Sequence, residues 1–304
     1  MKKVLLASTA LVATSSFATA QGVELSGYAE MGLIDGSSFS NVEFFHDFDV
    51  KFSLSGETDN GLTFGATIDL DEIGDDASCA GIAAIPDGTS TCTSVEEHSV
   101  FISGSFGTLT MGDTDGAFDF AMSEVGGLTA IADDHTTHAG YSGNGGLDGA
   151  NDGQILRYDY SFGDIVFAVS AELDDLDAFS GDVIGVGARW STDLGGTDLA
   201  VALAYQENDV VDMTGVSVRA GFGDFTAVLN YTDASTGADH TAVGVTYSAG
   251  AISVHANYGE FDGGADGFGV ALNYDLGGGA VAMIGYGDDS TGFDQWSAGI
   301  GMSF

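Results

Sequence analysis

The chain has 304 residues, of which 46 are acidic and six are basic, so its formal net charge at neutral pH is −40. So few basic side chains exclude proteins that neutralise nucleic-acid phosphates or anionic lipid head groups with Lys and Arg. The composition is 44% hydrophobic, with a mean hydropathy of +0.17, which excludes the weakly hydrophobic, highly charged composition of disordered chains.

The first twenty residues have the pattern of an export signal. Lys2 and Lys3 precede a short apolar stretch, Val4 to Ala13, and Ala18-Thr19-Ala20 supplies the small residues of a cleavage site. The apolar stretch is too short, and contains too much Ser and Thr, to anchor a helix in a bilayer. We therefore expect export and removal of residues 1–20, which leaves a single domain of residues 21–304 with four basic side chains.

From residue 22 onward, hydrophobic and polar side chains alternate, which predicts β-strands with one apolar and one polar face. In Asp47 to Ser55, for example, Phe48, Val50, Phe52 and Leu54 share one face. Many of the segments are about ten residues long, the length that a tilted strand needs to cross a bilayer. Sixteen such segments are predicted: 22–34, 43–56, 60–72, 97–105, 107–113, 153–162, 164–174, 182–194, 197–208, 213–222, 224–233, 239–248, 250–260, 266–276, 279–288 and 293–304.

The connections between these segments alternate between short turns and long loops. The short ones contain Gly and Asp, as in Phe162-Gly163-Asp164, whereas the long ones include 73–96 and 114–152. This arrangement is typical of an up-and-down outer-membrane barrel. The predicted fold is therefore all-β, a sixteen-stranded antiparallel transmembrane β-barrel. The alternative is a soluble antiparallel sandwich, which would have connections of similar length at both ends.

The basic residues test the assignment of the two faces, because a Lys or Arg toward lipid at the midplane would cost about 2–4 kcal/mol. In segment 279–288 the apolar face cannot be assigned, because the hydrophobic residues Val281 and Met283 fall on one face and Ile284 and Tyr286 fall on the other. All four basic residues of the mature chain fall on the polar face of their segments: Lys51, Arg157, Arg189 and Arg219.

Two hairpins and the chain end resemble one family. Ser103 to Asp113, Ser53 to Ala66, the opening Val23 to Gly27 and the terminal Phe304 are similar to general porins of purple non-sulphur and related α-proteobacteria. The resemblance runs from about Val23 to Phe304. It implies a homotrimer in the bacterial outer membrane, a third long loop folded into each barrel to narrow the pore, and recognition of Phe304 by the barrel-assembly machinery.

The same resemblance places the inward loop at about 113–153, a stretch of some forty residues without strand alternation, as is typical of functional loops. Family eyelets set an acidic loop against a cluster of Arg and Lys, but here acidic residues are expected on both sides. A cation-preferring pore for small hydrophilic solutes is therefore predicted; alternatively, the carboxylates are mostly a solvated surface. The residues expected at the constriction are Asp113, Asp115, Asp119, Glu124, Asp133 and Asp134 on the loop, and Asp47, Asp49, Lys51, Asp69 and Arg157 on the wall.

Cysteine and carboxylate residues suggest two further features of the loops. Cys79 and Cys92 form an even pair in an exported chain and are predicted to form a disulfide, which would contribute about 3 kcal/mol. The sequence Asp113-Thr114-Asp115-Gly116 begins like a calcium loop, but Phe118 replaces the Gly that an EF-hand requires. No cofactor is expected to be required, although the clustered carboxylates could bind Ca²⁺ or Mg²⁺ through oxygen.

Catalysis finds little support in the sequence. His135 and His138 could contribute to a metal site, but no Cys accompanies them and no helical pattern brings their rings together. No nucleophile-elbow motif occurs, so the prediction is a non-enzymatic pore. The alternatives are a barrel with a blocked lumen, acting as a structural or adhesive anchor, and an embedded hydrolase. Small inward-facing residues favour the pore, since they would leave room for water: Gly185, Gly187, Ala200, Ala202, Gly269 and Ala271.

Overall fold

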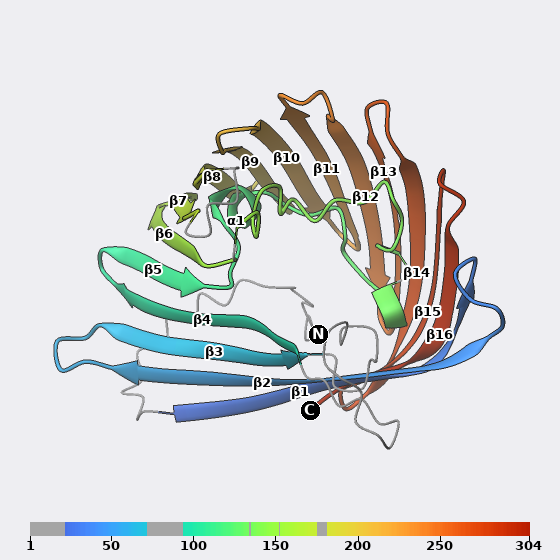
Figure 1. The fold of residues 1–304 in the computed structure, drawn as a ribbon. Coiled ribbons are helices and arrows are strands. Elements are labelled where there is room, and N and C mark those ends of the chain that lie inside the picture. Colours follow the sequence, from blue (N-terminus) through green and yellow to red (C-terminus); the bar gives the residue numbers. More distant parts are fainter. Residues whose placement is uncertain (1–21, 72–93, 134, 152, 175–180) are drawn as a thin grey trace, which may run out of the picture.

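The computed structural model describes residues 22–71, 94–133, 135–151, 153–174 and 181–304. Its sixteen strands pair antiparallel with their neighbours in the chain, and β1 pairs with β16, which closes the sheet into a barrel (Figure 1). The predicted fold class is confirmed. The strands are β1 (Gly22–Gly36), β2 (Glu43–Glu57), β3 (Thr63–Asp71), β4 (Ser94–Gly104), β5 (Gly107–Gly112), β6 (Ile155–Phe162), β7 (Ile165–Glu172), β8 (Val183–Asp193), β9 (Thr197–Glu207), β10 (Asp212–Phe222), β11 (Phe225–Ala234), β12 (His240–Ala249), β13 (Ile252–Phe261), β14 (Asp266–Gly277), β15 (Ala280–Asp289) and β16 (Asp294–Ser303).

The barrel is closed by main-chain hydrogen bonds at the chain end. The Phe304 N–H donates to the Gly27 carbonyl at 2.9 Å, and the Gly27 N–H donates to the Phe304 carbonyl at 3.3 Å. These bonds extend the pairing of β1 with β16, whose register joins Tyr28 to Ser303. No unpaired edge remains between the first and the last strand, as a β-barrel in lipid requires.

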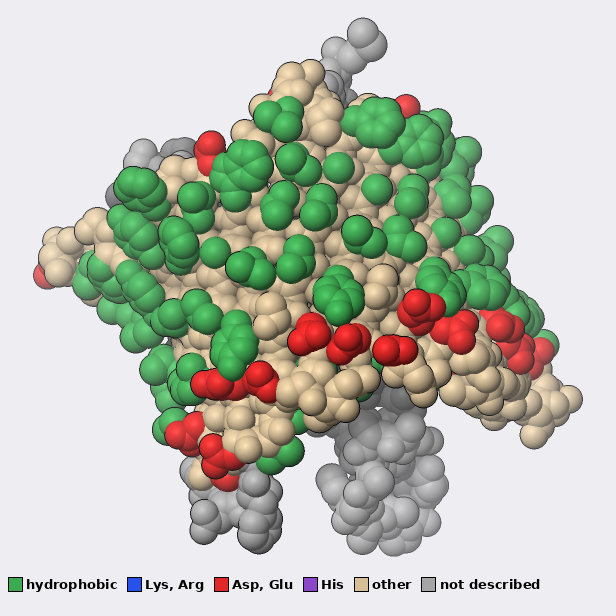
Figure 2. Space-filling model, turned by 90° about the horizontal axis from the view of Figure 1, so that it is seen from above, with side chains coloured by type: hydrophobic (Ala, Val, Ile, Leu, Met, Phe, Trp, Pro, Cys, Tyr) green, Lys and Arg blue, Asp and Glu red, His purple; other side chains and the backbone are tan. Residues whose placement is uncertain are grey.

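The outer surface of the barrel is apolar. Large hydrophobic side chains such as Leu203, Leu229 and Ile284 are exposed, as expected for a surface in contact with hydrocarbon. Figure 2 shows hydrophobic side chains spread over one face of the barrel. On the face shown, carboxylates gather along one edge of this hydrophobic belt. Glu207 and Glu260 lie near the ends of β9 and β13, beside the longer connections, and each accepts a hydrogen bond from a tyrosine hydroxyl two residues earlier on its strand.

The structure settles the two faces of β15. Cross-strand pairing places Met283 opposite Gly299 and Ile284 opposite Ala298, so Ile284 shares the outward face of β16 with Ala298. Met283 points inward, where it packs with the buried side chains of Ala130 and Ile131. The sequence pattern was ambiguous because β15 carries hydrophobic side chains on both faces, one set for lipid and the other for a segment inside the barrel.

Short turns connect the strands at one end of the barrel. Gly223 follows Phe222 and has φ +59°, a left-handed conformation that glycine adopts at little cost. It allows β10 and β11 to pair up to Phe222 and Phe225, so the connection has two residues.

The described helices are two short pieces within the longest described connection, α1 (Ala117–Ala121) and η2 (Ile131–Asp133). Neither is long and apolar enough to cross a membrane. The connection that contains them is the one between β5 and β6, and residues 113–154 are called the inner segment below. Cys79 and Cys92, the predicted disulfide, lie outside the described residues, as does Asp134.

Candidate functional site

The inner segment lies against the polar face of the barrel wall, on the concave side of the sheet in Figure 1. Main-chain groups of the segment bond to side chains of many successive strands, so the wall holds it along its length. Its first part is held by Ser170 and Ser217, whose hydroxyl oxygens accept from the N–H groups of Ala117 at 2.8 Å and Ser123 at 2.9 Å. Further anchors are Gln206 to Leu147, Asn230 to Asn144, Asn257 to His138, Asn273 to Thr129 and Ser297 to Ile131.

Glycines on the wall allow the segment's backbone to approach closely. A Cβ atom at Gly187 would lie 2.3 Å from the Ala117 carbonyl oxygen, one at Gly244 would lie 2.1 Å from that of Val125, and one at Gly269 would lie 2.0 Å from that of His135. These distances are far shorter than van der Waals contact, so the wall has no room for a side chain at these positions.

The small inward-facing residues therefore have a different role from the one expected. They were predicted to leave room for water, yet Gly185 and Gly187 lie beneath the segment near Ala117, and Gly269 lies beneath His135. Ala202 is buried against Phe118 and Met122, and Ala271 is buried as well; Ala200 is half-buried. On this side of the barrel, small side chains form a seat for the inner segment.

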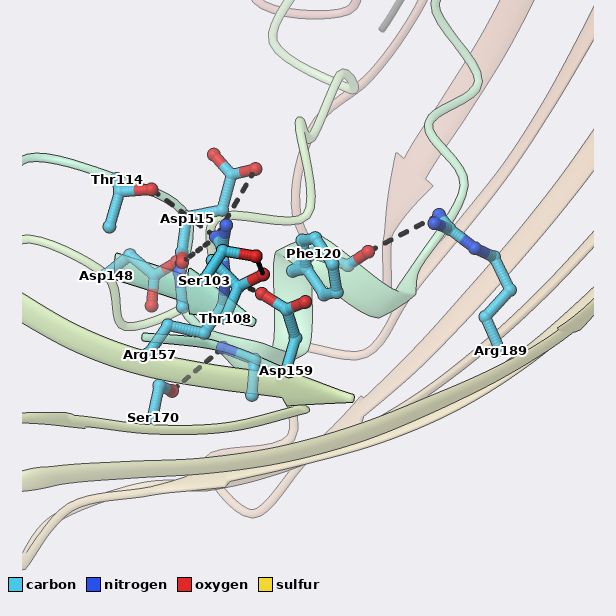
Figure 3. A network of polar contacts seen from close by, with 12 residues as sticks. Ser103, Thr108, Thr114, Asp115, Phe120, Asp148, Arg157, Asp159, Ser170 and Arg189 are labelled. Atoms are coloured by element: carbon cyan, nitrogen blue, oxygen red, sulfur yellow. Dashed lines mark hydrogen bonds and ion pairs between the residues drawn. The ribbon is translucent and has the colours of Figure 1, made fainter. Parts of the chain in front are cut away.

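Arg157 on β6 anchors the start of the inner segment. Its side chain is buried, with Nη1 donating to the Asp115 carbonyl oxygen at 2.5 Å and to Thr114 Oγ1 at 3.4 Å (Figure 3). The carboxylates of Asp159 and Asp115 lie 3.8 and 4.0 Å from the guanidinium group. The guanidinium group therefore binds the inner segment through Nη1, while Nε lies buried beside the Asp159 carboxylate.

Phe120 lies between two arginines. The Arg157 guanidinium carbon is 4.1 Å from the centre of the Phe120 ring, and that of Arg189 is 5.8 Å away, within the range of cation–π attraction. Arg189 Nη1 also donates to the Phe120 carbonyl oxygen at 3.4 Å (Figure 3). Two of the four basic residues of the lumen thus hold α1 in place.

Acidic residues of the inner segment gather beside α1. Asp119 is half-buried and lies close enough to Asp115, Glu124 and Asp148 to interact with their charges. Burial, followed by the repulsion from these carboxylates, raises the pKa of Asp119 to about 8, although Arg157 opposes the shift. Burial also raises the pKa of Asp148 to about 6, against the hydrogen bonds that it accepts from Gly116 and Gln206.

A second acidic group lies on β1 to β3. Cross-strand pairs set Glu30 beside Asp47, Tyr28 beside Asp49, and Lys51 beside Asp69, all on the inner face. Lys51 Nζ is 3.1 Å from Asp69 Oδ2. Asp133 joins this group from the inner segment, since the adjacent Ala132 N–H donates to Glu30 Oε2 at 3.1 Å.

The predicted constriction residues therefore form two groups. One contains Asp115, Asp119, Glu124 and Arg157, and the other contains Asp133 together with the four residues predicted on β2 and β3. Asp113 lies at the end of β5, where its N–H donates to the His98 carbonyl at 3.0 Å.

Two buried carboxylates that hold the inner segment were not predicted. The Glu172 carboxylate accepts from the main-chain N–H groups of Gly149, Asn151 and Gly153 at 2.8 to 3.1 Å. Glu30 holds η2 through Ala132. Strand alternation could have identified both as inward-facing, because Glu172 follows Ser170 on the polar face of β7 and Glu30 follows Tyr28 on that of β1. Which segment each would contact required the tertiary structure.

Within the described ranges, no three His, Cys, Asp or Glu side chains come together in a way that could hold a metal ion. His135 and His138 are buried against the barrel wall, where His138 Nε2 donates to Asn257 Oδ1 at 3.1 Å.

Comparisons with known proteins agree with the fold. A porin from Rhodobacter capsulatus is 33% identical over 158 residues, a similarity that covers 50% of this chain and 45% of the length of that protein. A triple mutant of Rhodopseudomonas blastica porin superposes with a TM-score of 0.72 at 21% identity, over 93% of this chain and 100% of that one. Another mutant of the same porin gives a TM-score of 0.70 at 21% identity, with the same coverage of both chains.

The family follows from a match over nearly the whole chain. The family model described as Gram-negative porin matches residues 7–304, which include all sixteen strands and the inner segment. The chain therefore belongs to the family of Gram-negative porins, β-barrel proteins of the bacterial outer membrane.

Proposed function

We propose that this porin is a general diffusion channel, a water-filled pore that passes small hydrophilic solutes and prefers cations. The family and the closed barrel of sixteen strands support a pore. They favour a channel over an embedded hydrolase or an anchor with a blocked lumen. The inner segment occupies one side of the lumen and would narrow the pore to a constriction between its acidic residues and the wall of β1 to β5.

The division of charge in the lumen carries the proposed preference for cations. Arg157 and Arg189 hold α1, and Lys51 pairs with Asp69. By contrast, Asp115 and Asp133 on the inner segment are exposed. Carboxylates that line a pore favour cations, and the low-dielectric barrel around them strengthens their field. A cation crossing the constriction would therefore meet negative charge on both sides.

Several predictions stay proposals, some made from the residues themselves and some from the resemblance to general porins. We infer that the chain is exported with residues 1–20 as its signal, assembles as a homotrimer in lipid, and uses Phe304 as its recognition signal for the barrel-assembly machinery. A disulfide between Cys79 and Cys92 and the binding of Ca²⁺ or Mg²⁺ to the clustered carboxylates are proposed on the same footing. We also propose that the channel requires no cofactor.

Measurement of the reversal potential in planar bilayers tests the proposal. Under a KCl gradient, the purified protein is expected to give large conductance steps with a potential of the sign that K⁺ permeation sets. Addition of Ca²⁺ is expected to shift that potential toward zero, because divalent ions would screen the constriction carboxylates. Large steps with anion selectivity would contradict the cation preference alone. Absence of conductance from folded protein would contradict the pore, and an assay of lipid hydrolysis would then test the enzyme alternative.

The selectivity is expected to depend on pH through Asp119. Its pKa is raised to about 8, so the carboxyl group is mostly neutral at pH 7 and becomes negative as the pH rises. The ratio of cation to anion permeability should therefore increase between about pH 7 and about pH 9. In the Asp119→Asn variant this increase should disappear. Asp164→Asn, which changes an exposed residue in the turn before β7, should retain it.

A further inference from the structure

Four histidines lie together where the middle of the inner segment meets the barrel wall. His135 and His138 belong to the segment, whereas His240 on β12 and His255 on β13 belong to the wall; these four are called the histidine layer. All four side chains are buried, with His135 at 3% and His255 at 1% exposure. The proposed channel function makes no use of them.

Two of the rings contact each other, and hydrogen bonds join the others to the segment and the wall. His135 and His255 meet edge to face, with ring centres 5.2 Å apart and planes at 88°. His240 Nε2 donates to the Gly140 carbonyl oxygen at 2.9 Å, and His138 Nε2 donates to Asn257 Oδ1 at 3.1 Å. On β13, His255 Nδ1 is 2.8 Å from Thr246 Oγ1. The layer thus connects residues 135–140 to two neighbouring strands of the wall, β12 and β13.

Two ring nitrogens on the segment side of the layer have no hydrogen-bond partner among the described residues: His135 Nδ1 and His138 Nδ1. A neutral imidazole can leave such a nitrogen without a proton, so the orphaned position costs little. An imidazolium carries a proton on both nitrogens. Each of these positions would then become a buried N–H donor without an acceptor, on a ring whose charge is also buried.

The environment of the layer opposes a positive charge. Burial, together with the neighbouring rings of His255 and His138, lowers the pKa of His135 to about 3. The pKa of His138 is lowered by burial and by His240, although its bond to Asn257 and the nearby Asp289 act in the opposite direction. These segment residues therefore stay neutral while they are seated, and take up protons more readily when they are in water.

The charged groups that face the layer do not reverse the preference of its rings for the neutral form. Asp289 on β15 is the carboxylate that acts on His138, but it already accepts from the N–H groups of Ala139, Thr291 and Phe293 and from the Thr291 hydroxyl. On the inner segment, the Tyr141 ring lies 5.9 Å from that of His138, and its hydroxyl donates to Glu124 at 3.1 Å. The charges that act on His135 are those of the His255 and His138 rings.

We propose that the histidine layer is an acid-sensitive latch, which seats the middle of the inner segment while its rings are neutral and releases it into the pore when they are protonated. This regulation rests on the proposed channel function. Flanking anchors would limit the movement, since Ser297 and Glu30 hold Ile131 and Ala132 on one side, and Asn230 holds Asn144 on the other. Because the wall lies behind residues 135–143, their released form enters the lumen and closes the channel.

The ratio of released to seated segment is expected to increase steeply as the pH falls. A ring that binds a proton only in the released state multiplies the ratio of released to seated segment by up to about tenfold for each pH unit below about 6.5. The sign follows from the lowered pKa values of His135 and His138 in the seated state, which hold fewer protons there than in the released state. Two such rings would give up to about a hundredfold per unit.

Single-channel recording between about pH 7 and about pH 4 tests the latch. The wild-type protein should show discrete closures whose frequency increases steeply as the pH falls. Titration of lumen carboxylates would instead lower the open-channel current gradually. The double variant His135→Phe and His138→Gln should close at least about tenfold less often at the acid end, because Phe keeps a ring against His255 and Gln keeps an amide donor toward Asn257. His138→Gln alone should have an intermediate effect.

His46→Gln is the matched control, since His46 is exposed on the outward face of β2 opposite Met31. It should close like the wild type, and circular dichroism at each pH should show that every variant keeps its barrel. Conductance at neutral pH without acid-induced closure would overturn the latch and leave the channel standing. Closures in the double variant as frequent as in the wild type would also overturn it. Absence of conductance at neutral pH would contradict the proposed channel and with it the latch.

Discussion

Replacement of Gly269 by Leu is expected to lift the inner segment from the wall and to reduce the conductance of the channel. A Cβ at this position would lie 2.0 Å from the His135 carbonyl oxygen and 2.5 Å from the His135 Cα, both of which are main-chain atoms. A rotamer change cannot relieve such a contact, so the segment must shift as a whole. Overpacking of this kind costs roughly 1–3 kcal/mol, which lowers the ratio of seated to displaced segment about 5- to 150-fold.

The matched control is Gly221→Leu on β10. Gly221 faces the lumen like Gly269, but the nearest atoms to its Cβ position are 3.7 Å away and belong to Asp198 and Thr226 on the wall. This variant should keep the wild-type conductance apart from the volume of the added side chain. Single-channel recording at neutral pH compares the two. Equal conductance of both variants would mean that the inner segment does not depend on its glycine seat.

The alternation of hydrophobic and polar side chains predicted the barrel, because its outer face meets lipid and its inner face meets the water of the lumen. On β2, Phe48, Val50 and Phe52 face outward and Lys51 faces inward, as the pattern indicated. Pairing across a sheet preserves this alternation, so a local pattern is enough to fix the global face. The same pattern left the faces of β15 open, because Val281 and Met283 face inward but pack in an apolar contact with Ile131.

The inner segment was predicted as a loop, but its contacts could not be predicted. Arg157 was expected on the wall of the constriction, and the structure adds that it is 9% exposed, with Nη1 bonded to the Asp115 main chain. The main-chain oxygen that a buried Arg binds depends on the path of an irregular segment. Such a segment has no repeating pattern of hydrophobic residues from which its path could be predicted. For the same reason, Gly187 and Gly269 were interpreted as open space when they provide a seat.

The histidines illustrate a third case. His240 and His255 fall on the polar face of their strands, so alternation predicts that they point inward. His135 and His138 lie in a stretch without strand periodicity, and from the sequence they were candidates for a metal site. Only the seating of the segment, which brings His135 to within 5.2 Å of His255, turns four separate residues into one buried layer.

Replacement of Arg157 by Gln is expected to free the start of the inner segment and to destabilise the protein. The variant loses a charged donor to the Asp115 carbonyl at 2.5 Å and the cation–π contact with Phe120. Hydrogen bonds that involve a charged group contribute about 1.5–3 kcal/mol each. The Asp115 side chain is 61% exposed and stays hydrated, so its loss of an ion partner should add little. The Asp159 side chain is only 18% exposed, so the loss of its ion partner should contribute more to the destabilisation.

Arg219→Gln separates this anchoring from the change in charge. Arg219 is exposed on the inner face of β10, so its replacement removes one positive charge from the lumen without removing a buried contact. Both variants should increase the preference for cations in a reversal-potential measurement. Arg219→Gln should change the stability by less than about 0.5 kcal/mol. Only Arg157→Gln should lower the temperature of thermal unfolding and increase current noise in the open channel.

The two readouts assign the role of Arg157. If the variants match in stability and noise and differ in selectivity alone, Arg157 acts as a lumen charge and its contacts with the inner segment contribute little. If Arg157→Gln unfolds earlier and gates irregularly while its selectivity resembles that of Arg219→Gln, the guanidinium acts mainly as an anchor. We expect the second result, because the Arg157 side chain donates to Asp115 and Thr114 on the inner segment and stacks on Phe120. The cation preference would then depend on where this arginine is held.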